Sequence, residues 1–282
     1  RGEWPSYRRV TWTARIPRAS LSPWTRRRLG SLVTLFAVAE EAARELAAFA
    51  AGEPPPPPPL SIQPHAREEF PGLFAEFRDG YLASDAGQQH LARYEADRAS
   101  GRANFEAVLA AQDQGQEIAD LVLDRLLPYA DVGENRAAGR WVMNAPVYKG
   151  PARNKHEGAG WQQPEDWPEA AAALVEFFRI CRDDPDQYDH ACLELAANPL
   201  AKGFQTGVLS PMLNALRPDL YHIHDLKTRR TLRFFYGRKF DQSIAAHPLA
   251  NAALDLLAQE FAPDLATASL PEDRHADLLD LF

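Results

Sequence analysis

Six consecutive prolines, Pro54 to Pro59, constrain the fold of this 282-residue chain more than any other feature of its sequence. Proline fixes φ and has no amide hydrogen, so such a run forms neither an α-helix nor a central β-strand. It adopts the extended polyproline II conformation, a semi-rigid spacer that rises about 3.1 Å per residue. We therefore expect a linker over residues 52–65, which separates residues 1–51 from a second domain at residues 66–282.

Positive charge is concentrated in two short segments of an otherwise acidic chain. The net charge is -8, yet residues 1–30 contain eight arginines and one glutamate, and residues 200–240 contain eight basic and two acidic residues. This distribution excludes a uniformly cationic nucleic-acid binder and favours local contact with a polyanion. The alternative is that both segments are solvated surface without a ligand.

Residues 1–51 contain the β portion that the sequence predicts. Tyr7 to Ile16 alternates aromatic or β-branched residues with polar ones, which indicates a strand with one buried face. Ser22 and Pro23 are typical of a helix start, so we expect a short helical turn there. The alanine-rich segment from Glu40 to Ala51 predicts a helix.

Apolar residues at helical spacing dominate residues 66–282, so the fold class that we predict is mainly α with a small β portion. Residues 140–148 have strand character. A glycine-rich loop follows, in which Arg153, Lys155 and His156 either contact phosphate or lie in a solvated connection. The segments with the clearest helical pattern are 88–97, 103–111, 116–127, 168–181, 188–197, 251–261 and 274–282.

The stretch from Gly203 to Asp225 predicts a helix with a sharply defined end. Pro218 lies where this helix must stop, and residues 221–223 are typical of a short extended segment. The apolar residues that recur on one helical face are Val208, Leu209, Met212, Leu213 and Leu216.

A basic helix is predicted directly after this turn. Residues 227–239 contain six basic residues and no acidic residue, with large apolar side chains between them. Asp225 precedes the helix and is a suitable N-cap. Arginine suits phosphate binding because its planar guanidinium donates two parallel hydrogen bonds. The residues that we expect to contact DNA phosphates are Arg26, Arg27, Arg28, Lys202, Lys227, Arg229, Arg230 and Arg233.

No motif of nucleotide hydrolysis, acyl transfer or zinc catalysis occurs in the sequence: GxxxxGK[ST], GxSxG, HExxH and CxxC are all absent. His222, His224 and Asp225 form an HxHD pattern that could bind a metal on a strand. No second cluster of cysteine or histidine supports a metal there, so we expect these residues to be structural or to face phosphate. We expect no metal and no cofactor in this segment.

Lys202 and Asp225 allow a catalytic alternative. Their order is similar to that of helix-hairpin-helix DNA glycosylases, which place a catalytic aspartate after the second helix and, in bifunctional members, a lysine in the hairpin region. The hairpin here reads KGFQTG and lacks the tight glycine-hydrophobic-glycine turn that grips phosphate with backbone amides.

The remaining features bear on compartment. Cys181 and Cys192 are too few for a disulfide framework and fit no zinc pattern, so we expect both to be reduced and buried in helices. No apolar run is long enough to span a membrane and no signal-peptide pattern occurs, which predicts a cytoplasmic protein without a membrane partner. Because the chain starts without methionine and ends on the apolar residues LLDLF, we expect it to be part of a longer protein.

Two blocks of the sequence resemble the region that precedes the motor in McrB-type AAA+ restriction proteins. YRRVTW followed by LSPWTRRRLGS is similar to the C-terminal edge of an EVE-like, PUA-related domain. GFQTGVLSPMLNALRPDLYHIHDLKTRRTLRFF is similar to the helical region between that domain and the motor, where a G-x-x-x-G-x-L-S-P start, a P-x-x-Y turn and a basic helix recur. The resemblance covers about residues 7–36 and 140–282.

The resemblance implies a non-catalytic recognition and linking region of a modification-dependent, type IV-like restriction system. Residues 1–51 would be the edge of the EVE/PUA-like domain, and the motor that hydrolyses GTP or ATP with Mg²⁺ would lie outside this segment. The implied partners are DNA, including DNA with modified bases, and a nuclease subunit reached through the motor. A structural adaptor that binds only proteins and a glycosylase-like enzyme are the alternatives.

Overall fold

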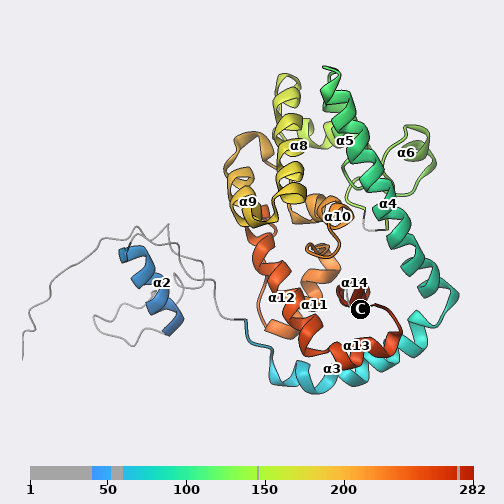
Figure 1. Cartoon of the computed structure of the whole chain (residues 1–282), viewed down its shortest axis with the longest axis vertical. Helices are drawn as coiled ribbons and strands as arrows, with labels where there is room; N and C mark the ends of the chain where they lie inside the picture. Colours follow the sequence, from blue (N-terminus) through green and yellow to red (C-terminus); the bar gives the residue numbers. More distant parts are fainter. Residues whose placement is uncertain (1–39, 52–59, 145, 272–273) are drawn as a thin grey trace, which may run out of the picture. The chain divides into compact units, whose positions relative to one another are not determined.

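The computed structural model describes residues 40–51, 60–144, 146–271 and 274–282, and the chain divides into two compact units, Arg1–Ser61 and Ile62–Phe282. In the first unit, α2 spans Glu40–Ala51 and confirms the helix predicted there (Figure 1). The predicted strand at residues 7–16, the helical turn after Ser22 and the run of prolines lie outside the described residues.

The second unit is helical, which confirms the mainly α fold class. Its described residues form no sheet; isolated β-bridges join Tyr129 to Val142 and to Tyr148, so the strand predicted at 140–148 is reduced to single bridges. Its helices are α3 (Pro64–Phe77), α4 (Asp85–Asp113), α5 (Ala119–Arg125), α6 (Gly133–Ala137), α7 (Ala152–Gly158), α8 (Trp167–Asp183), α9 (Tyr188–Ala197), α10 (Thr206–Leu216), α11 (Leu226–Tyr236), α12 (His247–Glu260), α13 (Ala262–Leu265) and α14 (His275–Leu281). None of the described helices is both long and apolar enough to cross a membrane.

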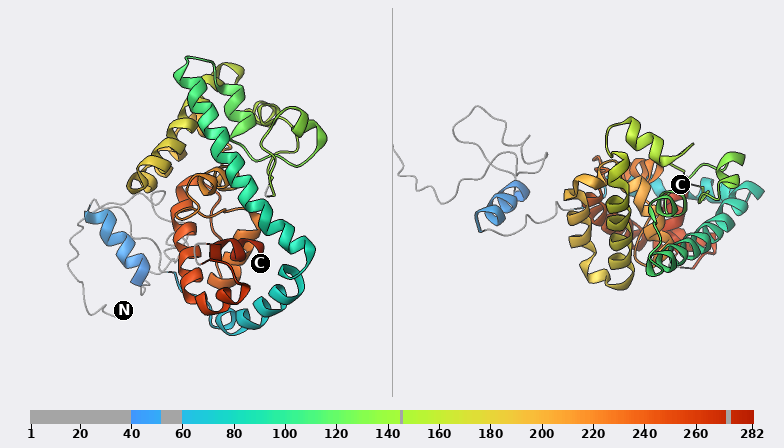
Figure 2. Two further views of the ribbon diagram at one scale, coloured as in Figure 1. Left: turned by 45° about the vertical axis from the view of Figure 1, so that its right-hand side comes forward. Right: turned by 90° about the horizontal axis from the view of Figure 1, so that it is seen from above.

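Helix α4 has 29 residues and extends across the second unit (Figure 2), where the sequence predicted two separate helices. Ser84 caps its start, since the Ser84 hydroxyl accepts a hydrogen bond of 3.2 Å from the Gly87 amide. Gly101 lies where α4 crosses α10. A Cβ atom there would lie 2.7 Å from the Cβ of Ala215, so the two helices approach this closely only because residue 101 has no side chain.

Helix α10 lies in the core of the second unit. All of its residues except Gly207 are buried, because α4 and α8 pack against it. It ends at Leu216, two positions before Pro218, as predicted. The Ser210 hydroxyl accepts a hydrogen bond of 2.8 Å from the amide of His224, which fixes the extended segment after the helix against α10.

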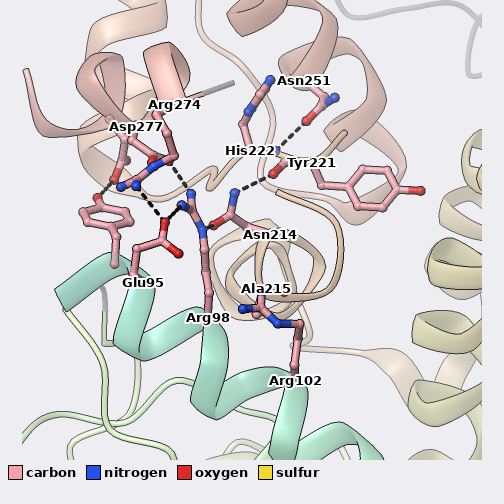
Figure 3. A network of polar contacts seen from close by, with 12 residues as sticks. Glu95, Arg98, Arg102, Asn214, Ala215, Tyr221, His222, Asn251, Arg274 and Asp277 are labelled. Carbon is pink, nitrogen blue, oxygen red and sulfur yellow. Dashed lines mark hydrogen bonds and ion pairs between the residues drawn. The ribbon is translucent and has the colours of Figure 1, made fainter. Parts of the chain in front are cut away.

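A buried polar network connects α4, α10 and α14 (Figure 3). Arg98 donates to the carboxylate of Asp277 at 2.5 Å and to the amide oxygen of Asn214 at 3.0 Å. Asn214 in turn donates to the backbone carbonyl of Tyr221 at 2.7 Å. Because the Arg98 side chain is buried, these partners replace the water that its guanidinium would otherwise bind.

The structure confirms that both cysteines are free and buried. Cys181 lies in α8 and Cys192 in α9. Burial raises the pKa of the Cys181 thiol to about 12 and also raises the pKa of Cys192, so neither is a thiolate at neutral pH.

Candidate nucleic-acid interface

The basic helix predicted from the sequence is α11. Asp225 caps it, as predicted: its Oδ1 atom accepts hydrogen bonds from the amides of Lys227 at 2.7 Å and Thr228 at 3.1 Å. The helix ends at Tyr236 and is capped by Gly237, whose φ of 61° is the left-handed conformation that glycine adopts without strain.

Helix α11 has a buried apolar face and an exposed basic face. Phe235 packs against the aromatic rings of Phe70 and Phe261, with centroids 5.1 and 5.3 Å away. We call four residues on the other side of the helix the basic face: Lys227, Arg229, Arg230 and Arg233. Three of these cations are exposed and Arg229 is half-buried. Helical spacing places them at neighbouring positions on the surface.

The basic face differs from the rest of the second unit in its ion pairing. Most arginines of the described helical unit pair with a carboxylate, as Arg93 does with Asp131 at 2.8 Å. Within that same part of the chain, no carboxylate lies within 4.0 Å of the basic face. Arg229 Nε donates instead to the backbone carbonyl of Asp225 at 3.1 Å. Among the described residues, no ion pair therefore occupies these four charges.

A cavity of about 450 Å³ opens where α10 and α11 begin. This volume lies within the range of about 300–1,000 Å³ that is typical of small-molecule sites. Lys227 and Arg229 belong both to its wall and to the basic face. The other lining residues are Asn144, Pro146, Val147, Gln205, Thr206, Gly207, Val208, His224, Asp225, Leu226 and Gln242.

The two histidines of the HxHD pattern have different surroundings. His222 Nε2 lies 2.6 Å from the Asp255 carboxylate, whereas the ring of His224 is fully buried. Burial, with smaller contributions from His247 and Arg229, lowers the pKa of His224 to about 3, so its ring is neutral at neutral pH. No group of three or more potential metal ligands occurs in the described part of the chain.

The other predicted phosphate contacts are distributed differently. Arg26, Arg27 and Arg28 lie outside the described residues. Lys202 is exposed in the turn before α10 and is not among the lining residues of the cavity. The structure thus brings four of the eight predicted residues together on α11.

The glycine-rich loop after residue 148 was wrongly interpreted as a connection, because Ala152–Gly158 form α7. His156 is buried and bonds to the Tyr148 hydroxyl at 2.8 Å and to Gln162 at 2.7 Å, so it does not face phosphate. Arg153 pairs with Asp120 at 2.5 Å. Two of the three polar residues of this loop therefore have structural partners.

Sequence reasoning missed the uncharged polar residues of the cavity. Asn144, Gln205 and Gln242 come from three loops that are far apart in the sequence, and no spacing connects them. The amide of Thr206 donates to the carbonyl of Gln242 at 2.8 Å, which fixes the loop after α11 beside the start of α10. The stretch from Gly203 to Asp225 and the basic run after it pointed to this part of the molecule, but not to Asn144 or Gln242.

No protein-family model, no curated protein and no solved structure matches this chain.

Proposed function

We propose that the second unit binds DNA by holding backbone phosphates on the basic face of α11. The observation that carries this proposal is the absence of any carboxylate partner for these four cations within the described helical unit, where most other arginines are paired. Unpaired cations keep their full Coulomb attraction for an external anion, and the contact releases condensed counterions from the DNA.

The acidic background favours a local contact over a general attraction. The chain as a whole carries a net charge of -8, so attraction for DNA is confined to places where positive charge is concentrated, such as the basic face. Arg229, Arg230 and Arg233 can each bind a phosphate through two nitrogen atoms, which fixes the orientation of the duplex as well as its position.

The resemblance to McrB-type proteins supports a more specific form of the proposal. In that form the chain is the recognition and linking region of a modification-dependent restriction protein. Its partners are DNA with modified bases, and a nuclease subunit recruited through a motor that hydrolyses GTP or ATP with Mg²⁺.

Two alternatives make different predictions. A structural adaptor that contacts only proteins would not bind DNA even at low salt. A glycosylase-like enzyme would release a base and would lose this activity in Asp225→Asn. The geometry favours a capping role for Asp225, because its carboxylate oxygen already accepts two amide hydrogen bonds from α11 and Lys202 does not line the cavity with it.

The test is a fluorescence-anisotropy titration of the full chain with labelled duplex DNA, with and without methylated cytosine, at about 50 and 200 mM salt. We expect the affinity to fall as the salt concentration rises. In the triple variant R229A/R230A/R233A, the salt slope, which is the change of the logarithm of the binding constant with the logarithm of the salt concentration, should be smaller in magnitude by about one for each phosphate that the variant no longer binds. The matched control is R67A/R136A/R179A, which removes the same charge from exposed arginines that pair with carboxylates. Equal affinity and equal salt slope in both triple variants would contradict the proposal.

A further inference from the structure

A π-helical turn at Arg78–Leu82 joins α3 to α4 (Figure 1). In this turn the amide of Ala83 donates to the carbonyl of Arg78 at 3.0 Å. Such turns are rare in proteins and occur frequently at functional sites. The hydroxyl of Ser84 donates to the carbonyl of Tyr81 at 2.6 Å and connects the turn to the start of α4. The turn therefore holds Tyr81 in a defined position.

Tyr81 has a flat and partly exposed ring. One face of the ring stacks on Phe77, with centroids 5.5 Å apart and an angle of 23° between the ring planes. The hydroxyl of Tyr81 bonds to Nδ1 of His90 at 2.8 Å, and the His90 ring lies edge-on at a centroid distance of 6.4 Å. Tyr81 is 36% exposed, and among the described residues no second ring stacks on it. We call Phe77, Tyr81 and His90 the aromatic platform.

Hydrogen bonds through α14 place the aromatic platform close to the start of α11. The carboxylate of Asp280 accepts hydrogen bonds from the hydroxyls of Tyr94 in α4 and Thr228 in α11. Tyr94 follows His90 by one helical turn, and its ring lies 5.8 Å from the His90 ring. Thr228 is the neighbour of Lys227. His90 and Lys227 therefore lie on the same side of this connection.

Two further observations place His90 near Lys227. The side-chain amide of Asn144, which lines the cavity together with Lys227, donates to the backbone carbonyl of His90 at 3.4 Å. Burial, and to a smaller extent the positive charges of Lys227 and Arg93, lower the pKa of His90. The basic face thus begins beside the aromatic platform.

The platform and the basic face differ in the chemistry that they offer. Beside the platform, Arg78 pairs with Asp79 at 2.7 Å and Arg93 pairs with Asp131 at 2.8 Å, whereas no ion pair within the described residues involves Lys227. The platform offers an aromatic surface for a base, and the basic face offers charges for phosphates. Proteins that bind single-stranded nucleic acid use this combination.

We propose that the aromatic platform stacks a base of single-stranded DNA that continues from a duplex held on the basic face. The exposed face of Tyr81 is the stacking surface, and Phe77 supports the ring from behind. Stacking accepts every base, because each base has a π-face. The preferred ligand of the second unit is then a junction between duplex and single strand. This inference rests on the proposed function, because it takes the duplex to lie on α11.

The first experiment compares labelled DNAs in fluorescence-anisotropy titrations of the full chain: a blunt duplex, and the same duplex with a 5′ or a 3′ single-stranded overhang. We expect one overhang to raise the affinity at least about fivefold, because a stacked base adds this much or more. An abasic overhang of the same length keeps the phosphates and should lose this gain. Equal binding of the blunt duplex and both overhangs would overturn the inference, and so would a gain that the abasic overhang retains in full.

Variants of Tyr81 separate stacking from packing. Y81F keeps the ring without its hydroxyl, and Y81L keeps an apolar side chain without the ring. We expect Y81F to keep the gain from the overhang and Y81L to lose it, with the affinity for the blunt duplex unchanged in both. Thermal unfolding checks that both variants are folded. A full gain in folded Y81L contradicts the inference.

Stacking can also be observed on the DNA itself, with the wild-type protein. The base analogue 2-aminopurine loses fluorescence when it stacks on another ring. We expect this loss on binding at one position of the overhang, in wild type and in Y81F, and a smaller loss in Y81L. If no overhang position changes in wild type, the platform does not stack a base.

The inference and the proposed function give different results when either one is wrong. If R229A/R230A/R233A weakens binding of the blunt duplex but an overhang adds no affinity in wild type, only the inference is wrong. If this triple variant binds the blunt duplex like wild type and Y81L loses the gain from the overhang, only the proposed function is wrong. If none of the DNAs binds, both are wrong.

Discussion

The hydroxyl of Tyr94 in α4 donates a hydrogen bond to the carboxylate of Asp280 in α14. The second carboxylate oxygen of Asp280 accepts a hydrogen bond from the Thr228 hydroxyl in α11. Asp280 is buried, so these two hydroxyl groups replace the water that would otherwise bind its carboxylate. They connect α4, α11 and α14 at one side chain.

We predict that Asp280 makes the stability of the second unit depend on pH. Burial, followed by repulsion from Asp225, raises the pKa of Asp280 to about 7, whereas the pKa in the unfolded chain is about 3.9. The folded state therefore binds the proton more tightly. The protonated Asp280 therefore adds to the free energy of unfolding. This contribution is complete below about pH 4 and is lost as the pH rises through about 7. D280N should remove this contribution, which is on the order of 1–4 kcal/mol.

The measurement is urea unfolding of the full chain at pH 5 and pH 8, followed by far-UV circular dichroism. Between these pH values, wild type should lose more unfolding free energy than D280N. D113N, which changes an exposed carboxylate at the end of α4, should behave like wild type. The same pH dependence in D280N and wild type would show that Asp280 does not titrate in this range.

Replacing Arg98 should destabilise the second unit strongly. R98M removes the donor that lies between Asp277 and Asn214, and loss of one partner of a buried ion pair costs about 3–5 kcal/mol. Because Asp277 keeps its ion pair with Arg274, we expect a loss near the lower end of this range. R179M breaks the exposed pair with Glu176 and should cost about 0.2–1 kcal/mol. Urea unfolding of both variants checks the difference. The double variant R98M/D277L should recover part of the loss, and no recovery would argue against the pair as its cause.

Two helical glycines should respond in opposite directions to alanine. At Gly101 an added Cβ would lie 2.7 Å from Ala215 and 2.9 Å from the ring of Trp141, so G101A should destabilise the protein by about 1–3 kcal/mol. At Gly72 in α3 no atom lies within 4 Å of the added Cβ, so G72A should stabilise by about 0.5–1 kcal/mol. Thermal unfolding of both variants measures the contrast. A stabilised G101A would mean that α4 and α10 can move apart at little cost.

The cap of α11 should contribute to stability through its side-chain oxygen. D225A removes the acceptor for the amides of Lys227 and Thr228 and should cost about 0.5–2 kcal/mol. D225N keeps an acceptor and should lose little. If both variants lose the same amount in urea unfolding, the charge of Asp225 and not its hydrogen bonds stabilises the helix.

Local patterns predicted the helices well where a clear start or stop lies in the sequence. Helix α9 spans the predicted residues 188–197, and α10 ends before Pro218. Prediction failed where distant packing decides the outcome. Residues 98–102 looked like a break between two helices, yet α4 continues through them, because Arg98 and Gly101 face α10 and α14. The β portion predicted for residues 1–51 stays a prediction.

The sequence predicted one part of the candidate site, the basic face, but not the cavity. The basic face follows from consecutive charges on one helix, so local composition was sufficient to find it. The cavity was not predictable, since its walls come from residues 144, 146, 147, 205–208, 224–227, 229 and 242.

The burial of α14 has a consequence for synthesis on the ribosome. Every residue from His275 to Leu281 is buried, and α14 packs against α11, α12 and α13, which are all made before it. The growing chain therefore exposes an apolar surface until Leu281 has left the exit tunnel, and the second unit cannot reach its final packing earlier. A translational pause just upstream of α14 would extend the time in which this surface is open to chaperones or to aggregation.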